Sequence, residues 1–370
     1  MKNLTKLLSI LFLFGLIFGA CEGPEGPAGL DGEDGEDGLN GIDGTATCFV
    51  CHDGTTIETV QGEFYSSQHA LGDIAVDYAG GRSYCAQCHS HQGFVEYHTT
   101  GSIAADYSAP EAWQCATCHT LHTAFDSTDW NFRASDAVTF LADGTTSFDS
   151  GNNNLCANCH QSRRNDDYYD VYTSDTTFTK TFTGDDISSY TAAAFGPSGS
   201  ATLNGTSDTL TVVFDVPSDY VYISSTHAGP HHGPQANVFL GVGAAGSVTG
   251  TTYSAHSGGC VMCHMGSASG HSFLPEDGNC TDCHTSGPPT SAMDEIADRI
   301  EAIADELESL HAIHYDDEEG VYHPMYASIT RDQFQAFWNF MIALEDRSDG
   351  AHNPTFVKAL LTDAETKLGL

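Results

Sequence analysis

Basic residues are scarce in this chain. Only 12 of its 370 residues are Lys or Arg, against 50 Asp or Glu, and the formal net charge is −38. A surface this acidic repels polyanions, so the composition excludes nucleic acid and anionic membrane surfaces as partners. Basic patches on other proteins, cations and mineral surfaces remain open as partners. The alternative is that the charge only keeps an exposed protein soluble.

Long apolar runs are also scarce, and the longest lies at the N-terminus. A charged start is followed by an almost wholly apolar segment, 7–20, which is too short to cross a membrane as a helix. Residues 1–20 are therefore predicted to be a secretory signal peptide. The sequence Phe18-Gly-Ala-Cys21 resembles the lipobox of bacterial lipoproteins, which implies that Cys21 becomes the lipidated first residue. An ordinary cleaved signal that leaves one unpaired cysteine is the alternative.

Cysteine is nearly absent outside one pattern. Of the 13 cysteines, 12 fall in six copies of Cys-x-x-Cys-His, and the remaining one is Cys21. This spacing is typical of c-type haem attachment, in which two thiols form thioethers to the porphyrin and the histidine ligates the iron. Disulfide bonds, a redox-active Cys-x-x-Cys pair or zinc sites are the alternatives, but they leave the histidine after every second cysteine unexplained.

We therefore predict six covalently attached haem c groups. The predicted thioether residues are Cys48, Cys51, Cys85, Cys88, Cys115, Cys118, Cys156, Cys159, Cys260, Cys263, Cys280 and Cys283. The predicted proximal iron ligands are His52, His89, His119, His160, His264 and His284.

Histidine, in contrast, is abundant. The six motifs use six of the 19 histidines, and the surplus is larger than an acidic protein of this size needs. We expect the surplus to supply a second axial ligand to each iron, because bis-histidine haem has no open site and suits electron transfer. The candidates are His69, His122, His232, His256, His271 and His352. Either of His231 and His232 can serve, and His232 is preferred. His91, His98, His227, His311, His314 and His323 are in reserve.

The spacing of these motifs divides the chain. Residues 45–164 form a four-haem region and 226–287 a two-haem region. Between them, 165–225 contain neither cysteine nor histidine. Alternating Thr and apolar residues at 176–182 and 209–216 predict strands, so this segment is predicted to be a β-rich insertion.

The two ends of the mature chain have their own patterns. Residues 21–44 carry glycine at every third position, which predicts a collagen-like acidic tether, with a trimerising stalk as the alternative. Residues 288–370 are predicted to be helical. Apolar residues from Ile296 onward, continuing to His314, follow the spacing of an amphipathic helix. Further helices are predicted at about 331–345 and 354–368. The expected fold class is mainly α and irregular, a multihaem cytochrome c fold organised around six haems.

Several stretches carry a resemblance to known families. They are Cys260-Val-Met-Cys-His-Met265, Gly270-His-Ser-Phe273 and Gly350-Ala-His-Asn-Pro354 in the C-terminal half, with 85–96 and 156–163 before them. They resemble secreted multihaem cytochromes related to pentahaem nitrite reductase and octahaem hydroxylamine oxidoreductase. The resemblance implies that His271 and His352 are distal ligands and that long C-terminal helices back the haems. Nitrite reductases usually carry a catalytic Cys-x-x-Cys-Lys haem, and all six motifs here end in histidine.

These observations predict an electron carrier with no catalytic residues of its own. We expect an exported protein, held by its lipid anchor at the outer membrane, on the cell surface or the periplasmic face. It would exchange electrons with redox partner proteins or an extracellular acceptor. One alternative is a reductase or oxidase of small nitrogen or sulfur compounds with one open haem, for which Arg133, Arg163 and Arg164 are candidate anion-binding residues. Another is a subunit of a cytochrome filament, in which neighbouring copies supply some distal ligands.

Overall fold

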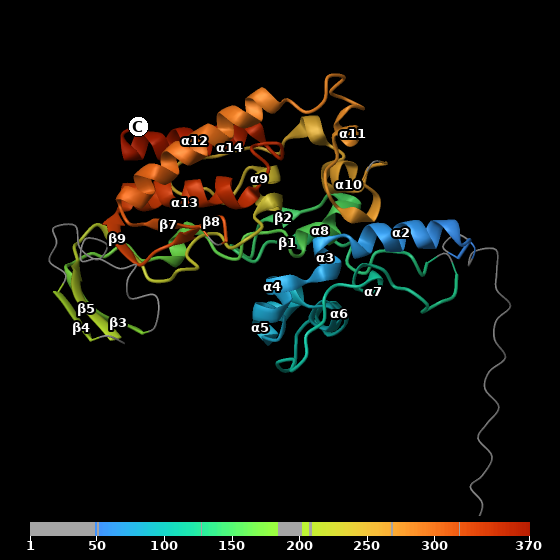
Figure 1. Ribbon diagram of the computed structural model, residues 1–370, viewed down its shortest axis with the longest axis horizontal. Coiled ribbons are helices and arrows are strands. Elements are labelled where there is room, and N and C mark those ends of the chain that lie inside the picture. Colours follow the sequence, from blue (N-terminus) through green and yellow to red (C-terminus); the bar gives the residue numbers. More distant parts are fainter. Residues whose placement is uncertain are drawn as a thin grey trace, which may run out of the picture. The chain divides into compact units, whose positions relative to one another are not determined.

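Short helices, three long helices and small sheets make up the described part of this chain, seen in a computed structural model (Figure 1). The structure describes residues 49, 52–126, 128–183, 202–206, 209–267, 269–317 and 319–370. These all lie in one compact unit, Thr45–Leu370. The predicted signal peptide, Cys21, the tether, and the first haem cysteines Cys48 and Cys51 lie outside the described residues. No described helix combines the length and the apolar character needed to cross a membrane.

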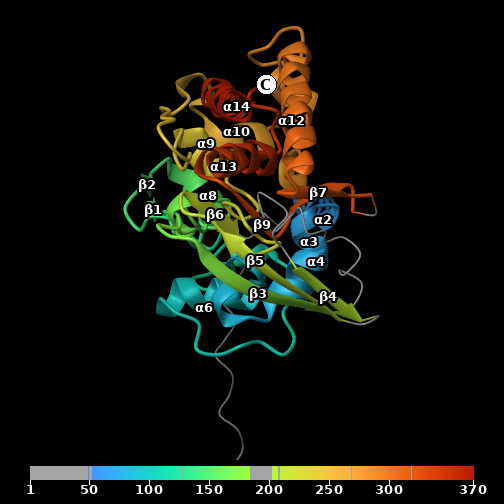
Figure 2. The same ribbon diagram turned by 90° about the vertical axis from the view of Figure 1, so that its left-hand side faces the viewer.

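Three long helices near the C-terminus build the main apolar core. They are α12 (Thr290–Ser309), α13 (Arg331–Asp346) and α14 (Pro354–Leu368), and they lie side by side (Figures 1 and 2). On α12, the buried residues Ile296, Ile300, Ile303 and Leu307 repeat about once per turn, as the sequence pattern predicted. The helices therefore form because each buries one apolar face against the other two.

Local signals fix where two of these helices start. Thr330 and Gln333 cap α13 reciprocally, each side chain bonding the other residue's backbone N–H. Asn353 accepts a hydrogen bond from the N–H of Phe356, and Pro354 occupies the first turn of α14. The predicted helices at 331–345 and 354–368 are confirmed.

The segment between α12 and α13 differs from the sequence expectation. Helix α12 ends at Ser309, and His314, which continued the helical spacing, lies instead in β7 (Ile313–Asp316). Strand β7 pairs antiparallel with β8 (Val321–Pro324), and β9 (Ala327–Thr330) follows. Aromatic and β-branched residues are common in these strands and suit a pleated, half-buried surface. Strand pairing therefore overrides the helical period here.

The predicted β-rich insertion is a three-stranded antiparallel sheet in the order β3-β5-β4 (Figure 2). The predicted strands are confirmed as β3 (Thr176–Thr183) and β5 (Thr209–Val216), and β4 (Thr202–Thr206) is the third. Alternate residues of β5 are buried. Strand β6 (Tyr220–Ile223) pairs with β9, so the end of the insertion is joined to the segment that enters α13.

The cysteine-bearing regions are short helices joined by loops. Before the insertion these elements are α2 (Thr55–Tyr65), α3 (Gln68–Leu71), α4 (Asp73–Ala75), a π-helical turn (Val76–Gly80), α5 (Ser83–His89), α6 (His91–Thr100), α7 (Cys115–Cys118), β1 (Val138–Thr139), β2 (Ser147–Phe148) and α8 (Asn154–Ala157). After it come α9 (Gln235–Leu240), α10 (Gly259–His264) and α11 (Asp277–Cys280). Helices α5 and α10 each contain a whole motif, which places both thiols and the imidazole, at i, i+3 and i+4, on one helix face.

Candidate haem-binding cavity

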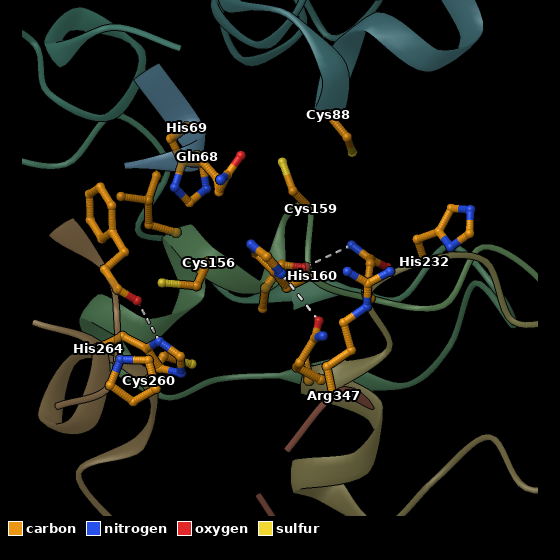
Figure 3. Close-up of a pocket in the computed structure, with 18 of the residues that line it drawn as sticks. Gln68, His69, Cys88, Cys156, Cys159, His160, His232, Cys260, His264 and Arg347 are labelled. Atoms are coloured by element: carbon orange, nitrogen blue, oxygen red, sulfur yellow. Dashed lines mark hydrogen bonds between the residues drawn. The ribbon is translucent and has the colours of Figure 1, made fainter. Parts of the chain in front are cut away.

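The motifs open onto one continuous cavity of about 2150 Å³. All ten described cysteines line it, as do 15 of the 19 histidines. Figure 3 shows Cys88 from α5, His69 from α3, and Cys159 and His160 from the segment after α8 around this space. Pockets for a single small molecule usually measure about 300–1,000 Å³. The cavity is therefore large enough for several cofactors held by these side chains.

The other interpretations of the cysteine pattern find no support in the described residues. All ten cysteines described there are free thiols, so they form no disulfide framework. Nor does the described part of the chain gather three or more His, Cys, Asp or Glu side chains in an arrangement that could hold a metal ion. A structural zinc site needs four such ligands in a tetrahedron. The described motifs thus keep their thiols available for thioether bonds.

Five motif histidines each have a histidine from elsewhere in the chain beside them. Ring centroids are separated by 6.0 Å for His52–His122, 5.9 Å for His89–His231, 6.1 Å for His160–His69, 6.2 Å for His264–His352 and 6.3 Å for His284–His256. A metal–imidazole bond is about 2 Å long, so two imidazoles on opposite sides of one metal have centroids about 6 Å apart. These five pairs match that spacing.

The remaining motif histidine is His119, and the remaining predicted distal histidine is His271. Burial lowers the pKa of His271, and the charge of His119 lowers it further. The sequence places the two residues far apart, His271 in the two-haem region and His119 in the four-haem region. Five of the six described motif histidines therefore face a second histidine ring, and His271 lies within electrostatic range of the sixth.

Four of the predicted distal histidines, His69, His122, His256 and His352, take part in these ring pairs. At His89 the facing ring is that of His231 and not of the preferred His232. The backbone of His231 is left-handed, with φ of 80°, and its ring centroid lies 5.4 Å from that of His232. The Nδ1 atom of His232 lies 3.0 Å from a carboxylate oxygen of Glu345, and its side chain is 61% exposed.

The reserve histidines lie in other surroundings. His227 stacks on Tyr78, and His323 bonds Glu319 through Nε2; both line the cavity. His91 bonds the hydroxyl of Thr117, and His98 packs against Phe94. These two, with His311 and His314, do not line the cavity.

Hydrogen bonds at Nδ1 orient several of the paired histidines. The Nδ1 atoms of His119, His264 and His256 lie 2.6, 2.8 and 3.0 Å from the carbonyl oxygens of Trp130, Phe273 and Ala351. Two more pair with side chains, His160 with Gln235 at 3.1 Å and His352 with Asp346 at 2.7 Å. A metal-bound histidine normally donates its second N–H in this way, which fixes the tautomer. Nε2 is therefore the atom left to bind iron.

Burial also keeps distal histidines neutral. It lowers the pKa of His69 to about 4, with smaller effects from His160 and His264. Burial likewise lowers the pKa of His231 to about 3. Only a neutral imidazole has a lone pair for a metal, so both residues are ready to ligate at neutral pH.

Thiols of different motifs lie near one another. The neighbouring thiol of Cys159 lowers the pKa of Cys88, and that of Cys260 lowers the pKa of Cys156. Both pairs join motifs that are far apart in sequence (Figure 3). Groups attached to these thiols would consequently lie against one another rather than in separate pockets.

The cavity gathers the few cationic residues of this acidic chain. Five of the 12 Lys and Arg line it, namely Arg82, Arg163, Arg164, Arg347 and Lys358. Arginine is well suited to pair with carboxylates, such as the propionates of a haem. Arg133, also a candidate anion-binding residue, does not line the cavity and instead bonds the carbonyls of Ala116 and His119. Arg163 and Arg164 line the cavity and stay candidates for binding an anion there.

Apolar side chains complete the lining. Ile74, Tyr78 and Tyr84 face the cavity, and each is more than half exposed. Large apolar side chains gathered at one exposed place mark a binding surface for an apolar partner. Thiols, paired imidazoles, arginines and apolar walls together fit porphyrins with carboxylate substituents.

Comparisons with known proteins add a distant likeness. No family model matches the chain, and neither does any curated protein. Among solved structures it is similar to the crystal structure of outer cell wall cytochrome OcwA, with 16% sequence identity and a TM-score of 0.47. The match covers 84% of this chain and 50% of that one, so the chain spans about half the length of OcwA. The assignment of the site rests on the residues described above.

Proposed function

We propose that this chain is an exported c-type cytochrome that binds six haems and carries electrons. The observation that supports the proposal most strongly is the pairing of five motif histidines with a second histidine ring about 6 Å away. When bound, haem supplies one-electron redox chemistry. The chain's residues attach the groups through thiols, hold both axial positions with imidazoles and surround them with apolar walls.

The pairing favours an electron carrier over an enzyme. A reductase or oxidase of small nitrogen or sulfur compounds needs an iron with an open position for its substrate. Within the described residues five of the six motif histidines face a second histidine ring, so the chain itself would supply the second ligand at those five sites. The same pairing reduces the need for distal ligands from neighbouring copies, and a filament that shares ligands is therefore disfavoured.

The closeness of the motifs suits transfer through the molecule. The nearby thiols of Cys88 and Cys159, and of Cys156 and Cys260, bring three motifs close together. His122 follows His119 by three residues and faces His52, which links two more. The chain's part in electron transfer is thus to hold its attachment sites close together and to exclude competing ligands.

The setting of the protein follows from its N-terminal sequence. Residues 1–20 would direct export, Cys21 would carry a lipid anchor, and 21–44 would tether the haem domain. We place the protein at the outer membrane, with a redox protein or an extracellular acceptor as its partner. The acidic surface favours a partner with a basic contact patch.

Intact-mass measurement with a carbon monoxide titration tests the proposal. The mature protein should carry the mass of six haems, and the dithionite-reduced form should show no spectral change with carbon monoxide, because all axial positions are filled. A protein without covalent haem would overturn the proposal. Rapid carbon monoxide binding by one haem would instead favour the enzyme alternative.

A further inference from the structure

Two adjacent carboxylates at the end of α13 each hold a histidine of the cavity. Asp346 Oδ1 lies 2.7 Å from Nδ1 of His352, and Glu345 Oε1 lies 3.0 Å from Nδ1 of His232. Both carboxylates are withdrawn from solvent, with side chains 0% and 8% exposed respectively. The pairs look alike locally but differ in what their histidines face.

Only one of these histidines stands opposite a motif histidine in the described structure. His352 faces His264, with ring centroids 6.2 Å apart. His232 has no such neighbour, because His231 takes the place opposite His89. Asp346 therefore acts on an axial position, whereas Glu345 acts on a histidine beside one.

The partner of His352 also differs in charge from those of the other paired histidines. His119, His264, His256 and His160 direct Nδ1 to neutral oxygens of carbonyl or amide groups. Glu63 is the nearest comparison, but its oxygen is 3.9 Å from Nδ1 of His271, beyond hydrogen-bond range, and its side chain is 34% exposed. Asp346 combines full burial with a short bond.

Further contacts hold the Asp346 carboxylate in place. The hydroxyl of Ser348 donates to its second oxygen, Oδ2. The same hydroxyl oxygen accepts from the backbone N–H of His352 at 3.3 Å. Carboxylate, serine and histidine thus form one small network between the end of α13 and the start of α14. Both ends are anchored in the main apolar core.

We propose that Asp346 is a positioning residue that makes His352 a more electron-donating ligand and lowers the reduction potential of the iron held by His264 and His352. This inference rests on the proposed function. A carboxylate bonded to the second nitrogen of a ligating histidine orients the ring and raises its basicity. A more basic axial ligand stabilises the ferric state, and axial ligation is one of the protein's controls on haem potential. In the described structure, the buried carboxylate of Asp346 would therefore lower the reduction potential of the haem at His264.

A matched pair of variants tests the proposal on the full haem-loaded protein. Asp346→Asn keeps the shape and an acceptor oxygen but removes the charge, and Glu345→Gln does the same beside His232. In a spectroelectrochemical titration Asp346→Asn should raise the potential of one haem. We expect about a tenfold change in its ratio of reduced to oxidised form, about 59 mV for one electron. Glu345→Gln also removes a buried charge that lines the cavity, but it should shift every potential by less than Asp346→Asn shifts the potential of that one haem.

Low-temperature EPR gives a second test, because its signals would not change if Asp346 only stabilised the fold. In Asp346→Asn one low-spin signal should change its g values, with the number of haems and of low-spin irons unchanged. Ser348→Ala, which frees Oδ2 and leaves the charge in place, should shift the same haem slightly in the opposite direction. Because Ser348→Ala is the milder substitution, it can still test the proposal if Asp346→Asn folds poorly.

The outcomes separate this inference from the proposed function. Unchanged potentials in Asp346→Asn, or no opposite shift in Ser348→Ala, would overturn the role of Asp346. A shift in Glu345→Gln of equal size would also overturn it, because loss of any buried charge beside the cavity would then have the same effect as loss of the bond to His352. Absence of haem from the unmodified protein would instead overturn the proposed function itself.

Discussion

The ring of His122 faces that of His52, with centroids 6.0 Å apart and an angle of 17° between the planes. His122 follows the motif histidine His119 by three residues, so one short loop serves two sites. Its left-handed backbone, with φ of 54°, turns its ring away from the motif that precedes it. This relationship connects the first motif to the third and is the basis of the first prediction.

Replacing His122 should open one iron without removing a haem. In His122→Ala we expect six haems by mass and one high-spin ferric signal, because His52 loses its opposite ligand. His314→Ala is the control, since His314 lies outside the cavity and is more than half exposed. Unaltered low-spin spectra in His122→Ala would show that His122 is not a ligand.

The adjacent residues His231 and His232 provide a direct comparison. His231→Ala should convert one haem to high spin, since His231 faces His89. His232→Ala should keep every haem low-spin, since no motif histidine ring faces the ring of His232 in the described structure and His231 takes the place opposite His89. Absorption and EPR spectra of the two variants check this. The reverse result would restore the preference for His232.

Asp129 should make the loop after His122 sensitive to acid. Its carboxylate accepts from the backbone N–H groups of Ala124, Phe125 and Thr123. These hydrogen bonds hold the pKa of Asp129 below its ordinary value, and the bond from Ala124 has the largest effect. Its contribution to stability is therefore present above the unfolded-state pKa, about 3.9, and lost as the pH falls through the lower folded-state value.

The matching experiment compares unfolding of Asp129→Asn and the unmodified protein from pH 7 down to pH 2. The variant should be less stable at neutral pH, and the difference should shrink at the acidic end. A difference that stays constant across this range would show that the carboxylate charge does not contribute.

The apolar face of α12 should carry a large part of the stability of the C-terminal helices. Ile303 is fully buried there, so Ile303→Ala should reduce the free energy of unfolding by about 2–5 kcal/mol. Glu301→Ala, on the exposed side of the same helix, should change it by less than about 0.5 kcal/mol. Chemical denaturation followed by circular dichroism measures both values, and equal effects would contradict the assigned face.

Local patterns were enough to predict the helices and the main strands. The period of Ile296, Ile300, Ile303 and Leu307 gives α12 its buried face, and the Thr-rich alternation gives β3 and β5. The hairpin of β7 and β8 was missed because His314 continued the helical period. Its residues Tyr315, Val321 and Tyr322 could have indicated the strands, because aromatic and β-branched residues favour them.

The sequence could not show which distal histidine faces which motif histidine. The motif spacing identified the thiols and one imidazole per site, but His69 reaches His160 and His271 reaches His119 only through the fold. The choice between His231 and His232 depends on one backbone angle and on Glu345, more than a hundred residues away. Asp346 was also missed, although an acidic residue shortly before the candidate ligand His352 was visible in the sequence.

Low-temperature EPR of the fully oxidised protein, with haem counted by pyridine haemochrome, tests the central claim most directly. Six haems with only low-spin ferric signals are the predicted result, because five motif histidines face a second histidine and we expect His271 to serve the sixth, at His119. A persistent high-spin signal from one of the six would contradict the account, since one iron would then lack its second protein ligand.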